Sequence, residues 1–409
     1  MKQFSTFLTE SKNVHMEHIE EMIFNDGVNG TRQAINFLRD IRNALAGNAA
    51  RPINFTVKWD GAPAIFAGTD PSDGKFFVAK KGVFNKNPQV FKSEKDIDND
   101  PKFPSDLKEP FKIALKELSK MGIRGVIQGD FMFGPGDLKT EEFEGESYLT
   151  FQPNTIVYAV PSGSKFAREL NSVKIGIVWH TTYTGRSLDS MKSSFGKSIA
   201  TKLRKNRSVW VDDANYKDQS GTATFTQRET TEITKILSKA GSTFNKVSAS
   251  VMNHIADTES LNTRMKVYNN AQIRQGSQIG FKNAVPGLID SLETFWSKEI
   301  DKVKTDGAKE KKTALKDEMI NYVKQNKSDI DKIYELMGLL TSAKQMIIDK
   351  LNKGSSLKTL LRTAYGFKVT NQEGYVAIDR LSNGAVKLVD RLEFSRANFS
   401  PDIIKGWER

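Results

Sequence analysis

The sequence lacks cysteine altogether, contains only four histidines and has no long hydrophobic run. Without cysteine the chain has no disulfide, no thiolate metal site and no cysteine nucleophile, and its composition suits a reducing compartment. No segment approaches the ~18 consecutive apolar residues of a membrane helix. Residues 1–22 contain no apolar stretch long enough for a signal peptide. We therefore expect a soluble, cytosolic protein with no membrane partner.

What is present indicates a folded protein of more than one domain. The chain has 409 residues, of which 38% are hydrophobic and 10% aromatic, which is enough for an ordered core. At about 150 residues per domain, two or three domains are expected. Lysine and arginine total 61 against 49 acidic residues, which gives a formal charge of +12. This balance favours an anionic partner, with nucleic acid the first candidate; a monomer is assumed.

Hydrophobic periodicity divides the chain into four parts and predicts an α+β fold. Residues 1–50 are predicted to be helical, because apolar residues recur there at helical spacing. Residues 51–190 contain short apolar or alternating runs separated by Gly, Pro and Asp, which indicates a β-rich domain with one helix at 107–121. Residues 191–365 are predicted to form a mainly helical inserted module. Residues 366–409 return to β character and are expected to supply the closing strands of the β-rich domain.

The helical module is predicted from amphipathic stripes. One stripe runs from Leu288 to Val303, and a longer one begins near Ser328, at a capping position, and closes at Gly354. The lysine-rich stretch 302–327 between them is expected to be a solvated helix or a mobile connection. Because the stripes can pair with one another, the module is expected to fold as a unit apart from the β-rich domain.

The segment FTVKWDGAPAIF, residues 55–66, places a lysine at the end of a predicted strand. Ile53, Phe55 and Val57 share one face of an extended segment, because side chains alternate with period two. If these residues pack inward, Lys58 points away from the core. Most lysines in such a position are ordinary surface charges. At the edge of a cleft, Lys58 would also be a candidate nucleophile.

Three further predicted strands each carry one charged residue on the face that the core does not use. They are VIQGDF with Asp130, EGYVA with Glu373 and AVKLV with Lys387. Two lysines and two carboxylates in a shared cleft would suit a nucleoside triphosphate and its metal ion.

In their order along the chain, these segments resemble the motifs of the covalent nucleotidyltransferase superfamily, which comprises ATP-dependent DNA ligases, RNA ligases and mRNA capping enzymes. Lys58-Trp59-Asp60-Gly61 matches the nucleophile motif Lys-x-Asp-Gly. Asp130 matches the acidic third motif, Glu373 begins the fourth motif, Glu-Gly-x-Val, and Lys387 matches the first lysine of the fifth. The resemblance covers about residues 50–190 and 365–395.

Two more segments carry the resemblance. FQPNTIVYAV, which begins at Phe151, is similar to the aromatic motif that stacks on or flanks the base. FVAKKG, which contains Lys81, is similar to the segment after the nucleophile. The form EGYVA is especially similar to RNA-repair ligases of large tailed bacteriophages.

The resemblance implies an ATP-dependent polynucleotide ligase with an adenylation domain of mainly antiparallel sheets and flanking helices. Lys58 would attack the α-phosphate of ATP and form lysyl-AMP. AMP would then pass to a 5′-phosphate end, which a 3′-hydroxyl would join. A free lysine is protonated at neutral pH and becomes a nucleophile only after losing its proton, which a nearby cation such as Lys387 or Mg²⁺ would favour.

The remaining site residues follow from the same resemblance. Asp60 would orient the lysine, and Lys387 would contact phosphate. Asp130 and Glu373 would hold Mg²⁺ or the ribose, whereas Lys81 and Phe151 would contact the nucleotide.

The sequence also departs from the family pattern. Asp130 stands where Glu is commoner, and Val389 replaces the second lysine of the fifth motif, a contact that Arg391 could restore. No oligonucleotide-binding domain follows the fifth motif, which favours RNA over DNA as the substrate. Two alternatives stay open: a DNA ligase in which the helical module replaces that domain, and a non-catalytic nucleic-acid- or partner-binding protein on a degenerate scaffold.

Two other signals are weaker. A basic run before Trp210 could follow a phosphate backbone, although a solvated helix end is an equal alternative; the run comprises Lys202, Arg204, Lys205 and Arg207. His15 and His18 lie near acidic residues but lack a clear third ligand, so they are interpreted as exposed helix histidines and not as metal ligands. His180 is interpreted as an ordinary strand residue.

Overall fold

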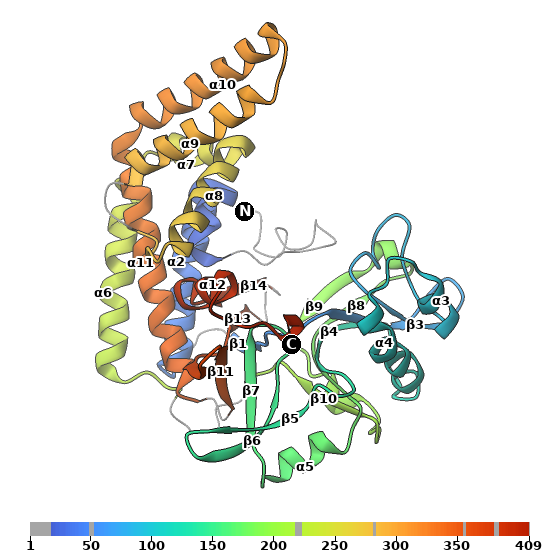
Figure 1. Cartoon of the computed structure of the whole chain (residues 1–409). Coiled ribbons are helices and arrows are strands. Elements are labelled where there is room, and N and C mark those ends of the chain that lie inside the picture. Colours follow the sequence, from blue (N-terminus) through green and yellow to red (C-terminus); the bar gives the residue numbers. More distant parts are fainter. Residues whose placement is uncertain are drawn as a thin grey trace.

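The computed structural model is a mixed α/β structure in which a tall group of helices stands on one side and mainly antiparallel sheets occupy the other (Figure 1); β10 and β8 form a parallel pair. It describes residues 18–48, 53–216, 223–280, 284–354, 357–379 and 384–408. The described residues form three sheets.

The first sheet joins a strand from the start of the chain to two strands near its end. Its strand order is β1-β13-β14, all antiparallel, and the strands span Ile53–Lys58, Gly374–Asp379 and Gly384–Val389. The C-terminal return to β character therefore does close a sheet begun by β1, as the sequence predicts.

The second sheet has the order β10-β8-β4-β2-β3, with β9 paired to β8. These strands span Val209–Asp213, Ile175–Thr184, Val126–Phe133, Ala64–Thr69, Phe76–Ala79 and Lys192–Phe195. Helix α4, Ser105–Leu118, covers one face with the apolar side chains of its inner stripe, beside the short helix α3, Glu94–Asn99. The expected boundary at residue 190 falls before β9 and β10, which still belong to this sheet.

The third sheet has the order β12-β11-β7-β6-β5. Its strands span Gly366–Thr370, Lys358–Thr363, Ile156–Pro161, Glu146–Phe151 and Lys139–Phe143. Helix α5, Lys165–Asn171, follows β7, and helix α12, Arg391–Phe399, follows β14.

The helical part combines an N-terminal helix with helices from the middle of the chain (Figure 1). Helix α2 spans Met22–Leu45 after the 3₁₀ turn η1, Ile19–Glu21. Helices α6 to α11 span Gln227–Phe244, Ala249–Asp257, Glu259–Arg274, Ala284–Asp301, Asp306–Gln325 and Lys327–Asn352. The long stripe predicted after residue 328 lies in α11, whose cap is Asn326 and not Ser328. The lysine-rich stretch is the helix α10.

One hydrophobic core serves both the helices and the first sheet. Phe55, Val57, Tyr375 and Leu388 point from that sheet into the core formed by α2 and α6 to α11. The expectation of a module that folds apart from the β-rich domain therefore needs correction, because the helices bury one face of a sheet that also carries Lys58. By period two, Lys58 lies on the opposite face of this sheet.

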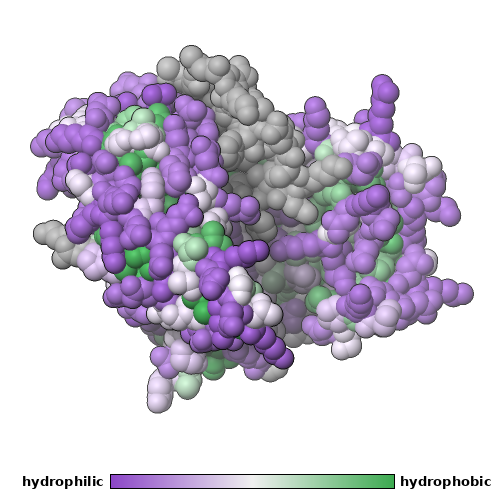
Figure 2. Space-filling view, turned by 90° about the horizontal axis from the view of Figure 1, so that it is seen from above, coloured by the Kyte–Doolittle hydropathy of each residue, from purple (hydrophilic) through white to green (hydrophobic). Residues whose placement is uncertain are grey.

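The surface above these parts is polar. In the view from above, the described side chains on both the helical part and the β-rich part are mostly hydrophilic, and part of the surface between them is hollowed (Figure 2). No helix among the described residues is long and apolar enough to cross a membrane.

Candidate active site

Lys58 is the last residue of β1, and its ammonium group pairs with the carboxylate of Glu373. The antiparallel register sets Lys58 opposite Gly374, the residue that follows Glu373, so strand pairing brings the two charges together. The Lys58 side chain is 29% exposed, and the Glu373 side chain is 10% exposed. The amine is therefore reachable from solvent although its partner is buried.

Lys387 lies on the same face of the sheet as Lys58. Its strand β14 sets it opposite Val376, two residues along β13 from the position facing Lys58. The two strands approach closely, since a Cβ at Gly374 would lie 2.3 Å from the carbonyl oxygen of Leu388. Gly374, in the EGYVA segment, therefore allows the close strand pairing that brings the segments carrying Glu373 and Lys387 together beside Lys58.

Asp60 holds the turn that follows Lys58. Its carboxylate accepts hydrogen bonds from the Asn154 side-chain amide at 2.7 Å and from the backbone N–H groups of Thr155 and Ile156 at 2.7 and 2.8 Å. The Asp60 N–H donates to the hydroxyl of Tyr158 at 2.7 Å. Burial raises the pKa of Asp60, and these bonds counteract part of that effect. Because its oxygens are already engaged, Asp60 suits the predicted orienting role.

Removing this carboxylate should destabilise the fold. Asp60→Ala leaves two buried backbone donors and one side-chain donor unpaired, so we expect the free energy of unfolding to fall by about 3 kcal/mol. Asp60→Asn should cost less than about half of that, because its amide oxygen still accepts both backbone bonds and the Asn154 amide can rotate to accept the third. Urea denaturation of the two variants measures this difference. Equal losses would contradict the assignment.

Gly61 brings this turn against β4. A Cβ at Gly61 would lie 2.5 Å from the Cβ of Asp130, so only glycine fits there. The N–H of Ala62 donates to the carbonyl of Phe131 at 3.0 Å and fixes the approach. Asp130 in turn faces His180 of β8, with 3.5 Å between its carboxylate and Nε2. Lys58 and Asp130 are therefore brought to one place by the Asp-Gly pair of the motif.

Lys58, Asp130 and His180 line a cavity of about 110 Å³ between the first and second sheets, whereas Glu373 and Lys387 are not among its lining residues. Its walls comprise Thr56, Val57, Lys58, Trp59, Asp130, Val178, His180, Phe195, Ala214, Val376 and Ile378. Cavities that enclose a whole drug-sized ligand measure roughly 300–1,000 Å³. This one has room for a phosphate-sized group, and a complete nucleotide would extend beyond it.

Burial dominates the electrostatics of Glu373. It raises the pKa of this carboxyl to about 7, and the nearby Asp60 adds to the effect, whereas Lys58 and Lys387 oppose it. Near neutral pH the group therefore exists in both protonation states, which is the condition for exchanging a proton with the Lys58 amine.

The Glu373 carboxyl should make stability depend on pH. Its folded-state pKa of about 7 exceeds the ordinary 4.5, so between these values the folded state binds more protons and the free energy of unfolding falls as pH rises. The change corresponds to about 3 kcal/mol between pH 4.5 and pH 8. Glu373→Gln should lack this component and exceed the wild type in stability at pH 8.5. A wild type and a variant with parallel pH profiles in urea denaturation would refute the expectation.

Phe151 belongs to a core and not to the cavity. It is fully buried and stacks on Tyr158 with 5.3 Å between ring centroids and 18° between ring planes. Its predicted contact with a base therefore needs correction, since no face of the ring is open. The segment FQPNTIVYAV instead meets the site through Asn154, Thr155 and Ile156, which bind Asp60.

Arg391 is also engaged elsewhere. Its guanidinium is 5% exposed and lies 2.7 Å from Glu21 and 3.4 Å from Glu20, and it donates to the Asn270 side chain at 2.6 Å. Lys344 joins the same buried cluster through Glu20 at 2.8 Å. We expected Arg391 to make the phosphate contact that Val389 cannot make. This expectation needs correction, because the Arg391 side chain neutralises the η1 carboxylates.

Lys81 and the basic run are exposed. Lys81 lies in the turn after β3. This turn is at the same end of the second sheet as Asp130, which β2 sets opposite Ala64. Lys81 is not among the residues lining the cavity. Lys202, Arg204, Lys205 and Arg207 lie in and after the short turn η3, Ala200–Lys202. The adjacent Trp210 is buried and stacks on Phe133. The run therefore presents charge to solvent without an exposed aromatic platform beside it.

A protein-family model that matches residues 13–402 is described as a family of unknown function, DUF6267. The chain belongs to this family. No curated protein and no solved structure matches it. In this member of DUF6267, the match spans the helices and the sheets alike, including every strand around Lys58.

Two histidines for which the sequence predicted no role, His180 and His18, lie at or near the site around Lys58. His180 lines the cavity, which the alternation of β8 could have indicated. His18 is extended and pairs with Lys387 through a backbone bridge, and its Nδ1 is buried. Burial, followed by Arg391 and Lys344, holds its pKa well below the ordinary value. The interpretation of His18 as an exposed helix histidine was wrong; His15 lies outside the described residues.

Metal ligands are few around Lys58. Among the described residues, no group of three or more His, Asp or Glu side chains could hold a metal ion. Asp130 and Glu373 supply two carboxylates. Asp130 lines the cavity, whereas Glu373 is buried against Lys58 and is not among the lining residues. Mg²⁺ commonly binds through one or two carboxylates together with substrate phosphates and water, so Asp130 is the carboxylate placed to meet a magnesium ion that would arrive with a nucleotide.

Proposed function

We propose that this protein is an ATP-dependent polynucleotide ligase, acting on RNA in preference to DNA, on a nucleotidyltransferase-type scaffold. The observation that carries the proposal is a solvent-reachable lysine at a strand end, paired with a buried carboxyl whose pKa is about 7, in a cavity that Asp130 also lines. Three of the four motif segments that resemble the superfamily line this cavity, and the strand of the fourth, which carries Lys387, pairs with β13 beside it. The EGYVA form supports RNA as the substrate.

The first step would transfer AMP to Lys58. The neutral amine attacks the α-phosphorus of ATP, an N–P bond forms, and the bond to the β-phosphate breaks so that pyrophosphate leaves. The amine must first lose a proton, and Glu373 is in contact with it and has a pKa suited to accepting that proton at neutral pH. Asp60 keeps the turn fixed while the lysine reacts.

The later steps would use the same groups. An oxygen of a 5′-phosphate end attacks the phosphorus of lysyl-AMP, and the N–P bond breaks to return the amine. A 3′-hydroxyl then attacks the activated 5′-phosphate, and AMP leaves. Lys387, on the face of Lys58, would contact the phosphates at each stage.

Magnesium would be held at Asp130 in this scheme, because Glu373 cannot serve as a metal ligand while it carries the proton taken from Lys58. The ion would neutralise charge on the transferring phosphate and the leaving group. Lys387→Ala and Asp130→Ala should both weaken adenylylation by removing phosphate and metal contacts.

Labelling tests the proposal directly. The wild type, incubated with α-labelled ATP and Mg²⁺, should acquire an acid-labile and alkali-stable label, as a phosphoramidate does. The labelled protein should then join nicked RNA or single-stranded RNA better than nicked DNA. Labelling by GTP instead would indicate capping chemistry, and preferred joining of nicked DNA would indicate a DNA ligase. A folded protein that takes no label from any nucleotide would overturn the proposal in favour of a non-catalytic binding protein.

A further inference from the structure

A second and larger cavity adjoins the one at Lys58. It measures about 440 Å³ and shares Val57 and Trp59 with the smaller cavity, but Lys58, Asp130 and His180 do not line it. Residues from β7, α5, β10 and the segments before β11 and β13 complete its wall: Val160, Pro161, Ser164, Phe166, Trp210, Asp212, Asp213, Asn215, Tyr216, Leu357 and Gln372. Its volume falls within the roughly 300–1,000 Å³ of small-molecule sites.

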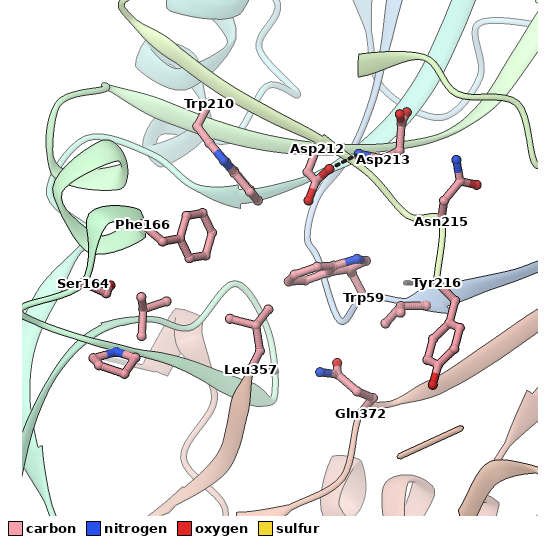
Figure 3. A pocket seen from close by; sticks show the side chains of 13 residues that line it. Trp59, Ser164, Phe166, Trp210, Asp212, Asp213, Asn215, Tyr216, Leu357 and Gln372 are labelled. Atoms are coloured by element: carbon pink, nitrogen blue, oxygen red, sulfur yellow. Dashed lines mark hydrogen bonds between the residues drawn. The ribbon is translucent and has the colours of Figure 1, made fainter. Parts of the chain in front are cut away.

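Aromatic rings form much of this wall. Trp59, Phe166, Trp210 and Tyr216 line the space (Figure 3), and they come from the turn after β1, from α5, and from β10 with the residues that follow it. The rings of Phe166 and Trp210 lie 5.7 Å apart between centroids. Rings arranged around a space offer their negative faces to a cation, and tryptophan does so best.

The charges in the wall are all acidic. Among the described residues that line the cavity, two are aspartates and none is lysine or arginine, although the whole chain carries a formal charge of +12. Asp213 accepts hydrogen bonds from the N–H groups of Ile199 and Ala200 at 2.7 and 2.8 Å, and it points away from the cavity. The carboxylate of Asp212 accepts a hydrogen bond from the N–H of Asp213 at 2.8 Å and points toward the indole of Trp59 (Figure 3). With carboxylates and no basic side chain among its described residues, this wall disfavours phosphate and suits a cation.

We propose that this second cavity binds a small organic cation of the alkylammonium or guanidinium class. The aromatic rings would contact its face or methyl groups, and Asp212, whose carboxylate has several acceptor positions, would pair with its charge. The site is independent of Lys58 chemistry, because the two cavities share only Val57 and Trp59.

Calorimetric titration of the full-length protein with choline tests the site. We expect saturable binding that is at least about 10-fold weaker for 3,3-dimethylbutan-1-ol, which has the same shape without the charge. N-acetyl-arginine amide is titrated in parallel, because tighter binding of this probe would assign the same site to an arginine side chain of a partner. Saturation by neither cation, or equal binding of choline and its neutral analogue, would overturn the proposal.

Variants locate the binding. Asp212→Asn and Phe166→Leu should each weaken choline binding by about 10-fold or more, whereas Asp317→Asn, which removes an exposed carboxylate on α10, should leave it unchanged. Lys58→Ala should also retain it, which separates this site from the proposed ligase activity. Thermal unfolding confirms that each variant is folded. If Asp212→Asn and Asp317→Asn bind choline equally well, the cation does not occupy this cavity.

Discussion

Lys58→Ala should abolish covalent labelling by ATP, because the cavity at the end of β1 contains no second lysine among the described residues. Lys58→Arg should be equally inactive, since a guanidinium stays protonated and cannot attack phosphorus. The arginine variant can still pair with Glu373, so it separates loss of the nucleophile from loss of the ion pair. Autoradiography of the labelled protein after denaturing electrophoresis measures the effect.

The matched control for this experiment is Lys309→Ala. Lys309 is exposed near the start of α10 and lines neither cavity among the described residues, and its removal should leave labelling intact. Peptide mapping should recover the AMP on residues 53–62. Persistent label in Lys58→Arg, or AMP mapped to another lysine, would disprove the assignment of the nucleophile.

Glu20→Ala should lower the free energy of unfolding by about 3–5 kcal/mol, because it leaves the buried Lys344 cation without its carboxylate partner, while Arg391 keeps Glu21 at 2.7 Å. Glu20 is fully buried and accepts hydrogen bonds from Lys344 at 2.8 and 2.9 Å, with Arg391 at 3.4 Å. Burial raises the pKa of Glu20, but Lys344 and Arg391 outweigh this and hold it below the ordinary value. The contribution is therefore present above the ordinary carboxyl pKa and is lost as pH falls through the lower folded-state value.

A double variant distinguishes this cause from a general packing defect. Glu20→Gln combined with Lys344→Met removes one buried charge of each sign and should recover a large part of the stability lost in Glu20→Ala. Glu310→Ala, at an exposed position on α10, should change stability by less than about 0.5 kcal/mol. Urea denaturation followed by circular dichroism gives all four values. A double variant as unstable as Glu20→Ala would show that the ion cluster is not the cause.

Local periodicity was enough to place most elements and the faces they present. The apolar stripes of α2 and α11 are buried as predicted, and the alternation in β1 and β14 sets Lys58 and Lys387 on the face opposite the helical core. These predictions succeed because side-chain direction in helices and strands repeats with a fixed period that is written in neighbouring residues. The helix cap at Asn326, two residues before the predicted Ser328, shows that element ends are less well determined than element faces.

Which of those faces meet was decided only by the tertiary structure. Lys58 reaches Glu373 because β1 pairs with β13 across more than half of the chain, and Glu20 reaches Lys344 and Arg391 in the same way. The sequence therefore indicated by itself most strands and helices, and the charged residue that each of four strand segments carries in or beside the strand. It did not determine that Arg391 pairs with buried carboxylates, that Phe151 is buried in a hydrophobic core, or that His180 faces Asp130. Those outcomes depend on burial and charge pairing between distant segments, for which local residue patterns carry no signal.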